Sequence, residues 1–104
     1  EAVQFVQQLA SPHFKLVLDV KAMCSEAKPI PAIIRDTWPH FAHFHANDAN
    51  LKGPGFGEVD FRPIAGALKQ VGYRGYVSVE VFKFEEGAEV IARKSLEYLR
   101  QAFA

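Results

Sequence analysis

Three short strand-like segments, each separated from the next by a stretch with helical periodicity, constrain the fold of this chain more than any other feature. The first, FKLVLDV at residues 14–20, is apolar on both faces until Asp19 ends it, which is typical of a buried parallel strand. The second, HFAHFHAN, alternates and predicts a strand that ends near Asn47. The third, GYVSVEVFKF, alternates again and predicts another strand.

The alternation also assigns side chains to the two faces of the predicted sheet. In the second strand, Phe41, His43 and His45 share one face. In the third strand, Glu80 lies beside Val79 and faces the opposite side. A carboxylate on a buried strand loses its hydration, which is costly unless a cation or hydrogen-bond donors meet it. We therefore expect Glu80 to have such a partner.

Four helices are predicted around these strands. The first covers residues 1–10, the second covers residues 31–38 and begins at prolines, the third runs from a cap at Asp60 to Gly72, and the fourth occupies residues 87–103. The element order is therefore α-β-α-β-α-β-α. This order predicts an α/β fold whose parallel strands are joined by right-handed crossovers.

Three parallel strands do not make a closed sheet. They leave two open edges and one partly bare face, which favours aggregation. The chain also opens at Glu1 inside a helical pattern, without an initiator methionine. We therefore expect a piece of a longer protein or a homo-oligomer, in which the remainder of a barrel or further copies cover the open edges.

Composition excludes several classes of partner. The 104 residues are 49% hydrophobic, as in one soluble globular domain, and lysine plus arginine equals aspartate plus glutamate at 12 each. Without net charge, no field attracts nucleic acid or an anionic membrane, and no apolar run approaches the roughly 20 residues of a spanning helix. Cys24 is the only cysteine, which excludes an internal disulfide and favours a cytoplasmic location.

Acidic and imidazole side chains lie where the three predicted strands end. Asp19 ends the first strand, His45 lies at the end of the second, and Glu80 lies in the C-terminal half of the third. Because the carboxyl ends of parallel strands share one edge of a sheet, these groups can meet. Two carboxylates and an imidazole suit a divalent cation such as Mn, Mg, Co or Zn. We therefore predict a metal site formed by Asp19, His45 and Glu80.

The end of the second strand and the loop behind it border this predicted site. We expect His43, Asn47 and Asp48 to bind the substrate. Other roles stay open, because His43 could support His45 from behind, and Asn47 and Asp48 could simply form turns. The glycines of GPGFG at residues 53–57 match no phosphate-loop spacing, so they indicate tight turns.

Two stretches together resemble a known family. HFHANDANLKGPGFGEVDF and, after a short helical stretch, GYRGYVSVEVF are similar to the C-terminal part of the xylose isomerase-like TIM barrels, the sugar phosphate isomerase/epimerase superfamily. The resemblance implies that residues 1–104 are the C-terminal segment of a (β/α)8 barrel. It also implies a partial TIM barrel whose three strands are equivalent to strands 6–8.

The resemblance implies a role for each of the three converging residues. Asp19, His45 and Glu80 would be metal ligands, and Glu80 would also act as one of two acid/base carboxylates. The other carboxylate belongs to the fifth strand of the family, which this chain lacks, so the chain alone is a poor candidate for an enzyme. Ala22 stands where the family often has a histidine, and the arginine that some epimerases place in the loop after the histidine strand has no counterpart near Leu51. Both departures argue against assigning one specific ketose.

The reaction implied by the family is metal-dependent isomerisation or epimerisation of a small-molecule sugar or polyol, by proton transfer next to a carbonyl. Two alternatives stay open. The chain could be a non-catalytic, oligomeric remnant of such a barrel that keeps part of a metal pocket. It could also be a zinc-dependent phosphodiesterase or endonuclease of the same superfamily, although this would require more histidine ligands and a basic surface.

Overall fold

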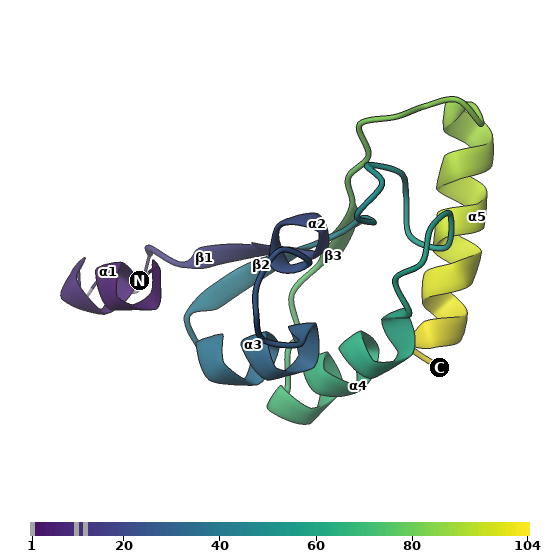
Figure 1. The fold of residues 1–104 in the computed structure, drawn as a ribbon. Helices are drawn as coiled ribbons and strands as arrows, with labels where there is room; N and C mark the ends of the chain where they lie inside the picture. Colours follow the sequence, from purple (N-terminus) through teal and green to yellow (C-terminus); the bar gives the residue numbers. More distant parts are fainter. Residues whose placement is uncertain (1, 10, 12) are drawn as a thin grey trace.

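The computed structural model of the chain describes residues 2–9, 11 and 13–104, which form an α/β arrangement around one small sheet (Figure 1). The parallel strands alternate with helices as predicted, and one additional short helix follows the first strand. The elements are α1 (Ala2–Leu9), β1 (Leu16–Asp19), α2 (Val20–Met23), α3 (Ile30–Thr37), β2 (Phe41–Ala46), α4 (Phe61–Val71), β3 (Val77–Val79) and α5 (Ala88–Ala102).

The sheet has the order β1-β2-β3, and both strand pairs are parallel. The register places Asp19 beside His45 and His45 beside Ser78, so the carboxyl ends of the strands lie at one edge. Both outer strands keep a free edge among the described residues, as the sequence predicted. The sheet alone therefore brings together the ends of strands that are far apart in the sequence.

Helices α3 and α4 pack against each other and cover one face of the sheet (Figure 1). Phe44 and Ala46 of β2 have no exposed surface, and they join Ile34, Phe61 and Leu68 in the core. Burying a side chain such as phenylalanine contributes about 1.5–3 kcal/mol to the free energy of unfolding. The other face of β2 carries the two histidines, which are only partly buried.

Phe41 lies in the core, which corrects its predicted face. The prediction grouped it with His43, but Phe41 is 2% exposed and packs with Trp38 and Tyr73 at ring-centroid distances of 5.4 and 5.3 Å. The cause is an irregularity in the register, because Leu16 pairs with Phe41 whereas the next residue of β1 pairs with His43. One residue of β2 is therefore skipped, and the alternation predicted from the sequence breaks there.

Two strands are shorter than their sequence patterns predicted. The first strand, predicted for residues 14–20, ends at Asp19, because Asp19 caps helix α2 by accepting a hydrogen bond from the Ala22 amide. The third strand, predicted from the alternation of residues 75–84, contains only Val77–Val79. Beyond it, the Glu80 amide still donates to the Ala46 carbonyl of β2, and the amides of Phe82 and Lys83 then donate to the carbonyl of Leu51 in the loop after β2. Backbone bonding to β2 therefore stops after Glu80, although the alternating pattern continues.

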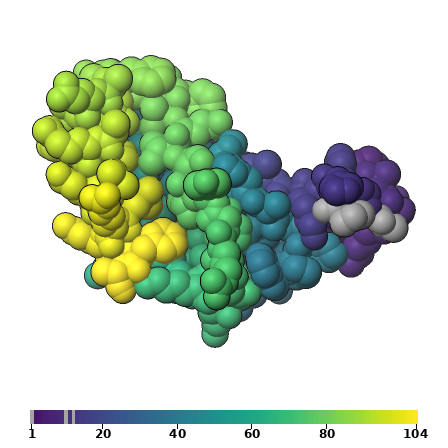
Figure 2. Space-filling model, turned by 180° about the vertical axis from the view of Figure 1, so that it is seen from behind, coloured from purple at the N-terminus to yellow at the C-terminus, as the bar shows by residue number. Residues whose placement is uncertain are grey.

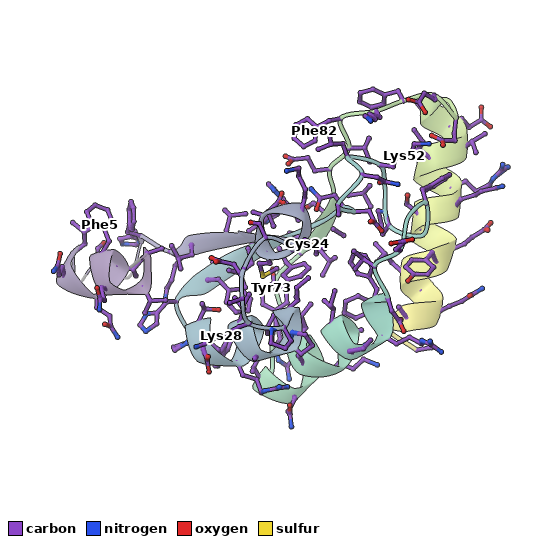
Figure 3. All side chains as sticks on the ribbon, viewed as in Figure 1. Phe5, Cys24, Lys28, Lys52, Tyr73 and Phe82 are labelled. Carbon is purple, nitrogen blue, oxygen red and sulfur yellow. The ribbon has the colours of Figure 1, made fainter. Side chains whose placement is uncertain are left out.

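Helix α1 projects from the body of the molecule beyond the start of β1 (Figures 1 and 2). It contacts β1, and Val6 is its buried side chain, but Phe5 is 55% exposed (Figure 3). Glu1 and Ala10, the first and last residues of the helix predicted from the sequence, lie outside the described residues. The apolar face of α1 is therefore only partly covered by the described part of the chain.

The glycines after β2 allow the loop to pack closely. A Cβ atom at Gly57 would overlap the carboxyl group of Asp48, and one at Gly55 would lie 2.9 Å from the Tyr98 ring. Gly55 also has a φ of 90°, which disfavours other residues. The Asp48 carboxylate is 2% exposed and accepts hydrogen bonds from the amides of Ala49 and Val59. The loop is thus folded around one buried carboxylate.

Asp60 caps helix α4, as the sequence predicted. It accepts hydrogen bonds from the backbone amide of Arg62 at 3.0 Å and from its guanidinium at 2.9 and 3.1 Å. The Arg62 side chain is the main reason that the pKa of Asp60 falls from 3.8 to about 2. Gly72, with a φ of 80°, ends the same helix.

In the described part of the chain, every helix is too short or too polar to cross a bilayer.

Replacement of Gly57 and of Gly66 by alanine should have opposite effects on stability. Gly57→Ala forces a methyl group into the Asp48 carboxylate and should cost about 1–3 kcal/mol, as overpacked sites do. Gly66→Ala is the matched control, because it lies within α4 with no heavy atom near its Cβ position. It should stabilise the fold by about 0.5–1 kcal/mol. Equilibrium urea unfolding measures both, and equal effects would contradict the packing of this loop.

Arg62→Met should raise the pKa of Asp60 from about 2 toward 3.8, because the guanidinium that stabilises the carboxylate is lost. Since the pKa of Asp60 is lower in the folded state, its contribution to stability is present above pH 3.8 and is lost as the pH falls through about 2. A carbon-detected NMR titration of the Asp60 carboxyl group measures this shift. Arg100→Met, on the exposed side of α5, should leave the titration unchanged.

Candidate metal centre

The side chains of Asp19, His45 and Glu80 meet at the carboxyl edge of the sheet. Asp19 is the last residue of β1, His45 precedes the last residue of β2, and Glu80 directly follows β3. The His45 Nδ1 atom lies 3.5 Å from Asp19 Oδ2 and 3.5 Å from Glu80 Oε1. One ligand atom from each residue lies within 4.8 Å of the others. The convergence predicted from the strand ends is therefore present.

The chemistry of this cluster fits a divalent cation. Two carboxylate oxygens and one imidazole nitrogen are suitable ligands for Mn, Mg, Co or Zn. Within the described ranges, no lysine or arginine forms an ion pair with Asp19 or Glu80, so a basic side chain does not already neutralise them. The side chains are 23% exposed for Asp19, 26% for His45 and 40% for Glu80, so an ion could reach them.

The environment of Glu80 differs from the sequence-based prediction. Glu80 was expected on a buried strand, but it lies just beyond β3 with a 40% exposed side chain, and Val79 beside it is 39% exposed. The open edge of β3 is the physical cause, because none of the described residues pairs with it on that side. Desolvation in this structure is therefore too weak to argue for a bound cation, and the argument depends on the geometry of the three ligands.

Asp19 is held by both of its carboxylate oxygens. Its Oδ1 atom accepts a hydrogen bond from the Ala22 amide at 3.1 Å, and its Oδ2 atom accepts one from Asn47 Nδ2 at 3.1 Å. The Oδ1 atom of Asn47 in turn accepts from the Lys21 amide at 2.8 Å. Asp19 Oδ2 is also the oxygen that faces His45, so the bonds orient the carboxylate toward the cluster.

Ion pairs hold the segment that follows Glu80 against the loop after β2. The Lys52 ammonium lies 2.8 Å from Glu86 Oε2 and 3.2 Å from Glu85 Oε2. The hydrogen bonds that Lys52 donates to Glu86 and Glu85 raise the pKa of Lys52, and the bond that Glu86 accepts from Lys52 lowers the pKa of Glu86. Lys52 and Phe82 lie on the same side of the molecule in Figure 3. No pattern in the sequence predicts this ion pair, because Lys52 and Glu86 are 34 residues apart.

The three predicted substrate-binding residues occupy different environments. The His43 ring stacks edge-on against His45 at a centroid distance of 5.1 Å and is partly buried. Asn47 is 0% exposed and lies beside Asp19. Asp48 is 2% exposed, and both of its carboxylate oxygens accept hydrogen bonds from loop amides. Of the three, His43 is the residue with accessible surface close to the cluster.

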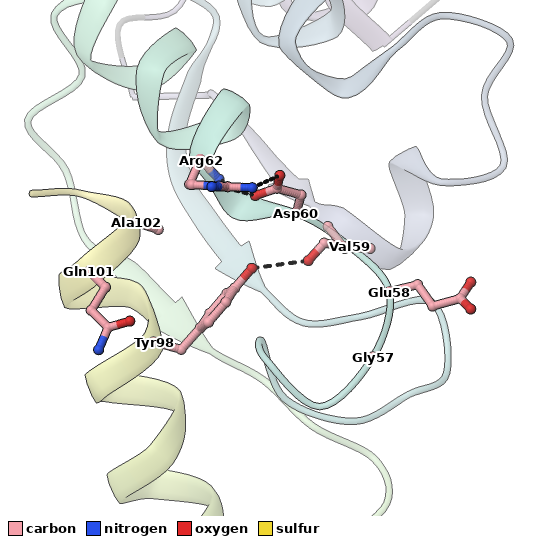
Figure 4. A pocket seen from close by; sticks show the side chains of 8 residues that line it. All are labelled: Gly57, Glu58, Val59, Asp60, Arg62, Tyr98, Gln101 and Ala102. Carbon is pink, nitrogen blue, oxygen red and sulfur yellow. Dashed lines mark hydrogen bonds and ion pairs between the residues drawn. The ribbon is translucent and has the colours of Figure 1, made fainter.

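The surface of the described residues has several hollows. One of about 470 Å³ lies between the loop before α4 and helix α5, where the Tyr98 hydroxyl donates to the Val59 carbonyl, and none of the three clustered residues lines it (Figure 4). A second, of about 400 Å³, follows the free edge of β1 and reaches Asp19. Apolar side chains of α1, β1, α2 and α3 line much of it. This second hollow therefore extends along the free edge of β1 as far as Asp19, one of the three clustered residues.

The curated proteins similar to this chain include sugar epimerases. D-psicose 3-epimerase of Ruminiclostridium cellulolyticum is 35% identical over 82 residues, which are 79% of this chain and 28% of that protein. D-psicose 3-epimerase of Enterocloster bolteae is 31% identical over 87 residues, which are 84% of this chain and 29% of that protein. The chain therefore spans less than a third of the length of these relatives.

Solved structures and a family model extend the similarity to nearly the whole chain. A D-psicose 3-epimerase structure in the presence of D-fructose matches with a TM-score of 0.87 and 26% identity over 97% of this chain and 42% of that one. The 3-keto-D-glucoside 4-epimerase of E. coli matches 94% of this chain and 37% of that one with a TM-score of 0.84. The family model for xylose isomerase-like TIM barrels matches residues 1–102. The chain belongs to this family, as a partial barrel of three parallel strands.

Proposed function

We propose that this chain supplies three metal ligands and one acid/base carboxylate to a metal-dependent sugar isomerase or epimerase. The observation that carries the proposal is the approach of Asp19, His45 and Glu80, one from the end of each strand, to within 4.8 Å. Membership in the family and similarity to D-psicose 3-epimerases support the reaction class. On this proposal, residues 1–104 are a C-terminal barrel segment equivalent to strands 6–8.

Each residue has a distinct part in the proposed reaction. Asp19, His45 and Glu80 would hold a divalent ion, which when bound would polarise the carbonyl and hydroxyl oxygens of a sugar. Glu80 would also exchange a proton with the carbon next to that carbonyl, since its side chain is the most exposed of the three. His43 would face the substrate beside His45. Proton return on the other side of the carbon requires a second carboxylate, which we assign to another barrel strand.

The free edge of β1 is the place where this further part of the barrel would attach. The hollow along this edge is mainly apolar and reaches Asp19 at its end. A strand paired with β1 would therefore satisfy exposed backbone groups, cover apolar side chains such as the 54% exposed Val17, and bring its own carboxyl end beside Asp19. Either the remainder of a barrel or a second copy of the chain could supply such a strand.

Glu80→Gln should weaken binding of Mn²⁺ or Co²⁺ by about 100-fold or more, because even residues behind the ligands cost 10–100-fold when replaced. Isothermal titration calorimetry with the metal alone measures this loss. Glu97→Gln on the exposed side of α5 is the matched control and should bind like the wild type. Equal affinity of the Glu80→Gln variant and the wild type would favour a structural remnant over a working metal site.

Within a barrel that contains this chain, the hydrogen next to the ketone of a sugar should exchange with solvent deuterium. Glu80→Gln should slow this exchange by about 10²–10⁴-fold, which is the usual contribution of an acid/base group. Proton NMR in heavy water with D-psicose and D-fructose as probes measures the rate. Hydrolysis of a phosphodiester without any hydrogen exchange would instead favour the endonuclease branch.

A further inference from the structure

The buried side chain of Asn47 connects the ends of β1 and β2 directly behind the metal cluster. Asn47 follows β2, is 0% exposed, and therefore offers no surface to a substrate. Its two polar side-chain atoms both have partners: Nδ2 donates to Asp19 Oδ2 at 3.1 Å, and Oδ1 accepts from the Lys21 amide at 2.8 Å. The amide orientation is fixed by this pair, because a flipped amide would set two donors against each other.

Asn47 donates its hydrogen bond to the oxygen of Asp19 that faces His45. Asp19 Oδ2 lies 3.5 Å from His45 Nδ1, whereas Oδ1 is turned toward the Ala22 amide at 3.1 Å. With one oxygen bonded to the start of α2 and the other bonded to Asn47, rotation of the carboxylate would break both bonds. Asn47 also leaves Oδ2 free to accept a further interaction, because a carboxylate oxygen has more than one lone pair.

We propose that Asn47 is a positioning residue of the metal centre, which orients Asp19 toward His45 and does not contact the substrate. The expected effect of Asn47 on metal binding depends on the proposed function, whereas the contact between Asn47 and Asp19 does not. Buried residues that orient a ligand typically contribute 10–100-fold to metal affinity. The two hydrogen bonds also join the end of β1 and the start of helix α2 to the end of β2, so one side chain connects the two strands that carry Asp19 and His45.

Two variants separate the two bonds of Asn47. Asn47→Ala removes the hydrogen bonds to both Lys21 and Asp19. The Lys21 amide then loses its acceptor, and the Ala22 amide loses the fixed Asp19 carboxylate, so both should lose protection from hydrogen exchange in NMR. Asn47→Asp keeps the size and the acceptor for Lys21 but replaces the donor to Asp19 by an oxygen, so Ala22 alone should lose protection. Asn50→Ala is the matched control, since Asn50 lies in the same loop and bonds only within it.

Metal affinity provides the second readout. Asn47→Ala should bind Co²⁺ 10–100-fold more weakly than the wild type in calorimetry, with an altered visible spectrum of the bound cobalt, while the control binds normally. Unchanged Ala22 protection in both Asn47 variants would overturn the inference, whatever the affinities. If the wild type binds no cobalt, the proposed function fails, and loss of Ala22 protection in Asn47→Asp would still establish that Asn47 orients Asp19.

Discussion

Parallel pairing of three short strands is the constraint on which the candidate site depends. Because the register places Asp19 beside His45, and His45 beside Ser78, two residues before Glu80, the strand ends alone bring three ligands to one edge. The core supports this pairing from one side only, through helices α3 and α4 packed on Phe44. The opposite face stays accessible, and it is there that His43 and His45 lie. Core and site thus occupy the two faces of one strand.

The loop after β2 holds in place the segment that follows the short strand β3. Strand β3 ends before Glu80, and the following segment is fixed by the carbonyl of Leu51 and by the ammonium of Lys52. The loop that carries these groups is itself folded around the buried carboxylate of Asp48. Asp48, which was predicted to bind substrate, therefore has hydrogen-bond partners within its own loop. By supporting that loop, it also supports the position of Glu80, the candidate ligand that follows β3.

The sequence predicted the convergence of Asp19, His45 and Glu80 because strand periodicity and parallel order are local and topological properties. It did not predict the core position of Phe41, because a skipped residue in strand pairing depends on the partner strand. Helix α2 is too short to have a periodic signal, and its cap also serves the candidate site. The exposure of Glu80 was missed because burial depends on which neighbours a strand has, and the pattern of one strand does not specify them.

The two carboxylate oxygens of Asp19 make different contacts, which limits the residues that could replace it. One oxygen starts a helix through the Ala22 amide, and the other faces the imidazole of His45. A glutamate is one methylene longer and would displace its carboxylate from one of these partners, while a histidine would offer a single acceptor in place of two oxygens. Selection of the ion at this position is therefore coupled to local chain folding: a ligand that suits another metal would also have to begin the same turn.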